Sequence, residues 1–405
     1  MDKNIISVYI PELAEENKPL YLNGNPLNAY LRKHEGDYKI SKDDLARFMR
    51  NAQPNEDSRL LDDYCLDDLN MHSVLAWKNM MELRHPSKRY LSMDNLDFLL
   101  QMGAYQIDRK EHRKPKMTMA CLLFLGRYDA IRQKFPHFHL EYINHRNCQG
   151  KARWSDRVST GDINFPDLNV FEFFQIVREK LRATINDTFE LDQNSERKSP
   201  AELEDALREA LANMLIHADY FDYGADIKVT VENLYYTFMN PGKMLVSTTQ
   251  FFTGGKSCPR NNTLITFFRR MGISERAGTG GVTLLTFAKV NRFSAPEIHS
   301  DYAQTILKLW IAAPFMTHTE LSQEERAIYE FIYKHPHGVS VTDIVAVTSL
   351  TKYHVRKLLH GFMEKGFITQ FGRAKATRYC CTPSLVERAD LLDQLGKSLL
   401  RVKKS

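Results

Sequence analysis

Glu209 and Asn213 stand four positions apart in the stretch REALANMLIHADY, which has the periodicity of a helix. Residues four apart on an α-helix are rotated by only about 40° from one another, so the carboxylate and the amide lie side by side. Together they can bind a polar ligand, although such pairs are common on ordinary helices. The pair marks a site only if other parts of the chain supply the rest of it.

Two glycine-bearing turns downstream supply such groups. The segment Asn-Pro-Gly at 240–242 closes a predicted hairpin, where a tight turn exposes polar groups to a ligand. Gly278, Gly280 and Gly281 precede a predicted helix, whose first N–H groups and dipole can receive phosphate oxygens. A glycine cluster before a helix is more often a plain turn. In this order and spacing, however, the features support one another and favour a phosphate-bearing ligand.

The string GGKS at 254–257 resembles the end of a phosphate-binding P-loop. The first glycine of that pattern would have to stand at position 250, which is Gln250, and no strand feeding a helix surrounds the string. The string therefore does not indicate a P-loop helicase motor.

The sequence also predicts the helices and strands that position these residues. The helix over 199–220 has Ser199 as its cap, Pro200 at its first position and Glu202 to complete a capping box. Apolar residues alternate over 225–244, which predicts a hairpin, and helices are predicted over 167–182, 263–271 and 282–290. Helices flanking an antiparallel hairpin fit a two-layer α/β sandwich.

The segments REALANMLIHADY, MNPG, SCPRNN and ISERAGTGG, in that order, resemble the divergent GHKL-type ATP-binding domain of bacterial AlbA/Schlafen-like transcriptional regulators, whose members are often labelled as RecG-related helicases. The strongest part of the resemblance covers 168–314. It implies that ATP and Mg²⁺ are the ligands.

The resemblance also implies roles for single residues. Glu209 would orient or deprotonate the attacking water, and Asn213 would ligate Mg²⁺. Ala218 replaces an arginine of the family and Asn262 a proline, and the loss of that arginine puts efficient turnover in doubt. Asn240 stands near the position of an aspartate that reads adenine in other GHKL ATPases. The full set of implied nucleotide contacts is Asn213, His217, Asp219, Asn240, Gly242, Arg260, Asn261, Gly278, Thr279, Gly280 and Gly281.

A second candidate site follows Thr317, where three predicted helices and a two-stranded hairpin give the order of a winged helix-turn-helix. The third helix leaves a basic face outside its apolar stripe, and the hairpin is basic as well. Double-stranded DNA is the expected partner, and a surface for protein contacts is the alternative. The predicted DNA contacts are Lys352, Tyr353, Arg356, Lys357, His360, Arg373, Lys375 and Arg378.

These elements predict an α+β multidomain chain with four segments. A partial AlbA-like α+β domain is expected over 1–115, because the family's first half of that domain is absent before Met1. The GHKL-like domain with its lead-in covers 116–317, the winged helix 318–384, and a C-terminal helix with a basic tail 385–405. We interpret the basic stretch at 109–116 as a solvated linker, and the apolar run before Gly126 as a buried strand or helix.

The composition is that of a globular protein rather than a fibrous or membrane one: 405 residues, 43% hydrophobic, 26% charged and a net charge of +5. No segment approaches the ~20 apolar residues of a membrane span, and the six cysteines have no zinc-site spacing. We therefore expect a cytoplasmic protein with no membrane contact. Apolar residues from Leu385 to Leu399 offer a homodimer interface, and a packed C-terminal helix is equally compatible.

The sequence is compatible with three functions. The first is a regulator in which nucleotide occupancy modulates a winged-helix DNA reader. The second is an ATPase acting in DNA processing or defence, tethered by the winged helix. The third is an interaction scaffold with a degenerate pocket.

Overall fold

The computed structural model describes residues 8, 10, 13, 17–33, 36–52, 55–111, 113–148, 150, 152–190, 200–223, 225–255, 258–273 and 278–392. The α+β multidomain architecture expected from the sequence is confirmed, with helices and several separate sheets. Ser199, the predicted helix cap, and residues beyond 392 lie outside the described part.

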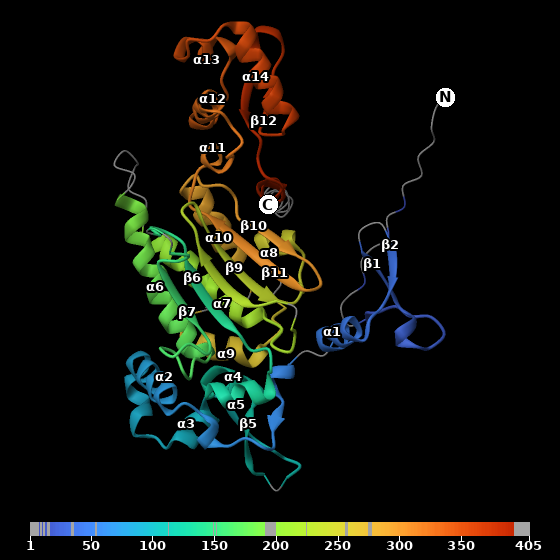
Figure 1. Ribbon diagram of the computed structural model, residues 1–405, viewed down its shortest axis with the longest axis vertical. Helices are drawn as coiled ribbons and strands as arrows, with labels where there is room; N and C mark the ends of the chain where they lie inside the picture. The colour runs from blue at the N-terminus through green and yellow to red at the C-terminus, as the bar shows by residue number, and fades with distance from the viewer. Residues whose placement is uncertain are drawn as a thin grey trace, which may run out of the picture.

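A six-stranded sheet forms the centre of the chain, with the strand order β10-β11-β9-β8-β6-β7 (Figure 1). Neighbouring strands are antiparallel, except that β6 and β8 are parallel. The predicted hairpin over 225–244 is confirmed, since β8 and β9 pair with Val229 opposite Phe238. The strands are β6 (Leu140–Asn144), β7 (Asp156–Ser159), β8 (Ile227–Val231), β9 (Tyr235–Pro241), β10 (Glu297–Ser300) and β11 (Gln304–Trp310).

One layer of helices covers this sheet. Side chains along β8 and β9 alternate between buried and partly exposed, so a single face is packed. The long helices α6 (Val170–Glu190), α7 (Pro200–His217) and α10 (Gly280–Val290) form the layer (Figure 1), joined by the shorter α8 (Thr248–Thr253) and α9 (Asn262–Arg270). The helices predicted from periodicity are confirmed, although α7 ends at His217 rather than Tyr220.

The N-terminal part packs below the helix layer. Helices α2 (Met71–Arg84), α3 (Asn95–Gln101), α4 (Met119–Leu125) and α5 (Tyr128–Lys134) accompany a small sheet of order β3-β5-β4, formed by Leu60–Leu61, Pro115–Thr118 and Tyr105–Ile107. The apolar run before Gly126 is therefore a helix, and the expected boundary at 115 falls on the first residue of β5. Buried residues from Leu61 to Ile311 form one continuous core.

Two smaller modules flank this body. At the N-terminal side, β1 (Tyr30–Lys33) and β2 (Gly36–Lys39) form a hairpin that leads into α1 (Lys42–Ala52). At the C-terminal side, α11 (Pro314–Thr317) leads into α12 (Gln323–Lys334), α13 (Val341–Val347) and α14 (Lys352–Glu364), followed by the hairpin of β12 (Ile368–Phe371) and β13 (Arg378–Cys381). The C-terminal helices have their own core. No helix in the described ranges is long and apolar enough to cross a membrane.

Candidate functional site

Glu209 and Asn213 lie side by side on α7, as their spacing predicts. The Asn213 Nδ2 atom donates a hydrogen bond to Glu209 Oε1 at 3.2 Å, and both side chains are half-buried. The first residue of α10, Gly280, lies directly against the pair: a Cβ atom there would be 2.5 Å from Asn213 Nδ2 and 2.5 Å from Glu209 Oε1. The N-terminus of α10 and the pair on α7 thus form one polar cluster that only a glycine permits.

The Glu209 carboxyl has an altered acidity in this setting. Burial raises its pKa above the usual range, and the hydrogen bond from Asn213 and the charge of Arg208 oppose the shift only partly. A carboxylate whose pKa is raised toward neutrality is a better proton acceptor than an ordinary surface glutamate. The chemistry available at this point is therefore the removal of a proton from a bound water.

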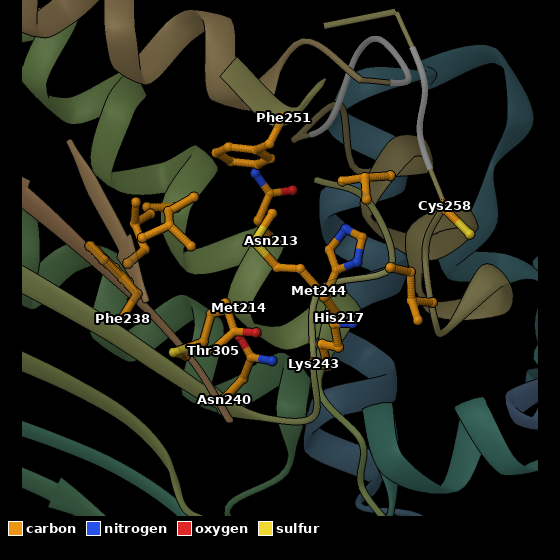
Figure 2. Close-up of a pocket in the computed structure, with 15 residues that line it drawn as sticks. Asn213, Met214, His217, Phe238, Asn240, Lys243, Met244, Phe251, Cys258 and Thr305 are labelled. Carbon is orange, nitrogen blue, oxygen red and sulfur yellow. The ribbon is translucent and has the colours of Figure 1, made fainter. Parts of the chain in front are cut away.

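A pocket opens beside the cluster, between α7, the strands β9 and β11, and the segment that follows β9 (Figure 2). Its cavity volume is about 70 Å³, and it opens to solvent. Most of its lining is apolar, with a few polar groups. The lining residues are Ala210, Asn213, Met214, His217, Phe238, Asn240, Lys243, Met244, Leu245, Val246, Phe251, Cys258, Ile298, Thr305 and Leu307.

Asn240 is a polar group on the sheet side of this pocket, as is Thr305 (Figure 2). It lies at the end of β9, opposite Thr305 on β11, and only 6% of its surface is exposed. Its amide nitrogen donates to the Pro241 carbonyl at 3.0 Å, so the amide oxygen is the group left to accept a hydrogen bond from a ligand. The following Gly242 has φ of 92°, and a Cβ there would be 2.9 Å from the Arg260 guanidinium.

The glycine segment at the start of α10 is closely packed. Gly278 has φ of 79°, a conformation that favours glycine. A Cβ on Gly281 would lie 2.1 Å from the carbonyl oxygen of Phe251, so α8 rests directly on the first turn of α10. Residues 274–277, within the predicted SERAGTGG segment, lie outside the described part of the chain.

His217 lines the pocket in its neutral form. Burial, and then the positive charge of Arg260, lower its pKa to about 4. It can donate or accept a hydrogen bond at neutral pH, but it adds no positive charge for a phosphate.

Arg260 is bound to the protein rather than directed at open solvent. Its guanidinium donates to the His217 carbonyl at 3.2 Å, to the Lys243 carbonyl at 2.9 Å and to Asn51 of α1. It therefore ties the end of α7 to the pocket-lining segment after β9.

Asp219 and Asn261, two further predicted contacts, do not line the pocket. Asn261 donates to the carbonyls of Ile216 and Ala218, both at 2.8 Å, and so closes the C-terminus of α7. Asp219 is buried and pairs with Arg50 of α1 at 2.9 Å. Their placement assigns both to the scaffold of the site.

Several pocket residues were not found from the sequence. Lys243 follows the Asn-Pro-Gly turn immediately, and this position was a usable signal. Cys258 belongs to the SCPRNN segment, although it was not among the predicted contacts, whereas Phe251 and Thr305 come from segments with no motif of their own.

The C-terminal module presents the basic face that its sequence predicts. The buried stripe of α14 contains Val355, Leu359 and Phe362. Of the hairpin cations, Arg378 is half-buried and donates to the carbonyls of Lys375 and Thr377. The exposed members of the predicted set are Lys352, Tyr353, Arg356, Lys357, His360, Arg373 and Lys375.

Two family models match parts of the chain. Residues 46–141 match a "Domain of unknown function (DUF8451)", and residues 224–309 match "Putative ATP-dependent DNA helicase recG C-terminal". The second match includes Asn240 and Gly278 to Gly281, but it begins after the end of α7 at His217 and so does not include Glu209 or Asn213. It supports the broad RecG-related family expected from the sequence, and it suggests ATP binding.

Comparisons with whole proteins add little. No curated protein matches the chain. Among solved structures, the crystal structure of the DIP2311 protein from Corynebacterium diphtheriae is similar at 11% identity and a TM-score of 0.43, covering 88% of this chain and 76% of that one.

Proposed function

We propose that the pocket beside α7 binds ATP with Mg²⁺, and that the C-terminal module is a winged helix that binds double-stranded DNA. The observation that carries the nucleotide assignment is the contact of Gly280 with Glu209 and Asn213. It puts a helix N-terminus, an amide and a carboxylate of raised pKa at one end of a largely apolar pocket.

The two ends of the pocket suit the two ends of a nucleotide. The amide oxygen of Asn240 accepts a hydrogen bond from an amino group on a base, and the apolar side chains of Met214, Phe238 and Leu307 cover its rings. The N–H groups at the first turn of α10 have no partner within the helix, and they receive phosphate oxygens together with the helix dipole.

The residues present also fit a magnesium ion. An amide oxygen is among the hard ligands that Mg²⁺ accepts, and Asn213 lies directly against Gly280 at the first turn of α10. Bound Mg²⁺ would neutralise charge on the phosphates. Asn213 would hold the ion through its amide oxygen, while its amide nitrogen orients Glu209 through the hydrogen bond between them.

The DNA assignment is supported by the exposed cations of α14 and of the β12–β13 hairpin. Tyr353 is 80% exposed. Lys352 and Arg356 lie one turn apart on the exposed surface of α14, and Lys357 is the exposed neighbour of Arg356. A helix of this kind enters a major groove, while hairpin cations such as Arg373 contact phosphates.

Helix α10 connects the two sites. Its first residue contacts the Glu209–Asn213 pair, and residues at its other end contact the C-terminal part of the chain. Lys289 pairs with Asp390, and the Arg292 carbonyl accepts a hydrogen bond from Tyr333 of α12. A shift of α10 on phosphate binding is therefore passed to the winged helix, which makes the chain a nucleotide-responsive transcriptional regulator.

The test of this function is the DNA affinity of the full chain with and without ATP and Mg²⁺. Nucleotide is expected to change the affinity by at least about fivefold, the lower end of ordinary coupling between sites. Asn213→Ala should remove the response, and Asn79→Ala, an exposed asparagine on α2, should leave it intact. Equal DNA affinities with and without nucleotide would refute the nucleotide switch.

A second candidate function, an ATPase acting on DNA, is favoured by the raised pKa of Glu209. Phosphate release above background that collapses in Glu209→Ala, but persists in Glu330→Ala on α12, would support it. A sensor would show equally low turnover in all three proteins.

A further inference from the structure

The turn between β4 and β5, residues 108–114, concentrates cations that the proposed function leaves unused. The sequence suggests a solvated linker here, but the structure shows a hairpin turn whose second strand, β5, belongs to the small sheet. The turn lies at the end of the long axis opposite α14 (Figure 1). It therefore extends from the body of the protein where a large partner can reach it.

Hydrogen bonds fix the shape of this turn. The Asp108 N–H donates to the Lys114 carbonyl at 2.8 Å, and the Lys114 N–H donates to the Glu111 carbonyl at 3.0 Å. The Lys110 N–H donates to the Asp108 carboxylate at 2.8 Å. These hydrogen bonds join the described residues of the turn, 108–111 and 113–114, at its base.

The charges in the turn are divided into two groups. The acidic residues gather on one lysine: Lys116 Nζ lies 2.9 Å from Asp108 and 3.0 Å from Glu111, and it also pairs with Asp62 of the adjoining segment. These carboxylates surround an ammonium group already, so they form an ion-pair cluster rather than a metal site.

The other group consists of four exposed cations with no such neighbours. Within the described residues, no carboxylate lies at ion-pair distance from any of them. They are Arg109, Lys110, Arg113 and Lys114.

We infer that this turn is a second contact surface for the phosphate backbone of duplex DNA. Four exposed cations on one short turn match the dense negative charge of a duplex. The four side chains are long cations, which contact phosphates regardless of sequence. The choice of DNA over another polyanion rests on the proposed function.

The two DNA surfaces can be separated by mutation because they lie at opposite ends of the molecule (Figure 1). The probe is a random-sequence duplex, with binding to the full chain measured by fluorescence anisotropy over a range of salt concentrations. The turn variant is Arg109→Gln, Lys110→Gln, Arg113→Gln and Lys114→Gln. The control removes the same number of exposed cations elsewhere, at Lys39→Gln, Lys42→Gln, Lys88→Gln and Arg89→Gln.

The turn variant is expected to bind the random duplex at least tenfold more weakly than the parent. The slope of log affinity against log salt should fall by about 2 to 4, since each lost phosphate contact contributes about 0.9. The control should keep most of the slope. If the quadruple variant does not fold, Lys110→Gln with Lys114→Gln should give about half the fall.

Equal slopes for the turn variant and the control would overturn the inference. So would a turn variant that loses affinity for polyglutamate as strongly as for the duplex, because the surface would then bind polyanions without preference. The winged-helix proposal is tested separately by Lys352→Gln, Arg356→Gln and Lys357→Gln. If those changes leave DNA binding unaltered, that proposal fails while the result for the turn stands.

Discussion

Gly281→Ala is the substitution whose effect the structure defines best. The new Cβ would lie 2.1 Å from the Phe251 carbonyl oxygen, whereas ordinary contacts begin near 3.4 Å, so the backbone of α8 must retreat. Overpacking of this kind costs about 1–3 kcal/mol, and the higher helix propensity of alanine returns about 0.5–1 kcal/mol. We expect a net loss of about 1–2 kcal/mol in the free energy of unfolding.

The same retreat moves Phe251 away from the pocket that it lines, so nucleotide binding should weaken with stability. A loss of about 1.4 kcal/mol in binding is a tenfold rise in Kd, which calorimetry with ATP and Mg²⁺ resolves. The matched control is Gly361→Ala in α14, where a Cβ would meet no atom within 4 Å. It should stabilise the protein by about 0.5–1 kcal/mol in denaturant titrations and leave the Kd unchanged.

If Gly281→Ala were as stable as Gly361→Ala and bound nucleotide like the parent, the close packing of α8 on α10 would be refuted.

Two further predictions concern the scaffold of the site. Arg50→Gln removes the cationic partner of the buried Asp219 carboxylate, so it should cost about 3 kcal/mol of unfolding free energy. Arg59→Gln breaks an exposed pair and should cost less than about 1 kcal/mol. Similar losses for the two variants in urea titrations would contradict the burial argument. Lowering the pH from 7 to 4 should reduce the free energy of unfolding by up to about 3 kcal/mol through His217. The folded pKa of this ring, about 4, lies below the unfolded value of 6.5, so over this range the unfolded chain binds the extra proton. His217→Asn should flatten that pH dependence, and an unchanged profile would show that the ring is not held neutral.

Local pattern was enough to predict the helices and the pair on α7. The spacing of Glu209 and Asn213 fixes their contact once the helix forms, and the alternation over 225–244 fixes the hairpin. The glycines at the start of α10 were read from the sequence as a phosphate-binding turn, and the close contact of Gly280 with Glu209 and Asn213 was not predicted.

What the sequence could not provide were contacts between distant segments. Asp57 accepts hydrogen bonds from the N–H groups of Thr263 and Leu264 and so caps α9 from over 200 positions away. Arg50 and Asp219 likewise meet only because α1 docks on the end of α7. Such pairs depend on the tertiary fold, and the periodicity of either segment does not predict them.

The central claim is that the polar cluster of α7 and α10 forms a Mg²⁺-dependent nucleotide site. The most direct measurement is calorimetric titration of ATP, with and without Mg²⁺, into the parent chain, Asn213→Ala and Asn79→Ala. We predict that the parent and Asn79→Ala bind equally and more tightly with Mg²⁺, while Asn213→Ala binds at least tenfold more weakly and without a Mg²⁺ effect. The absence of binding by the parent, or an Asn213→Ala variant indistinguishable from it, would contradict the claim.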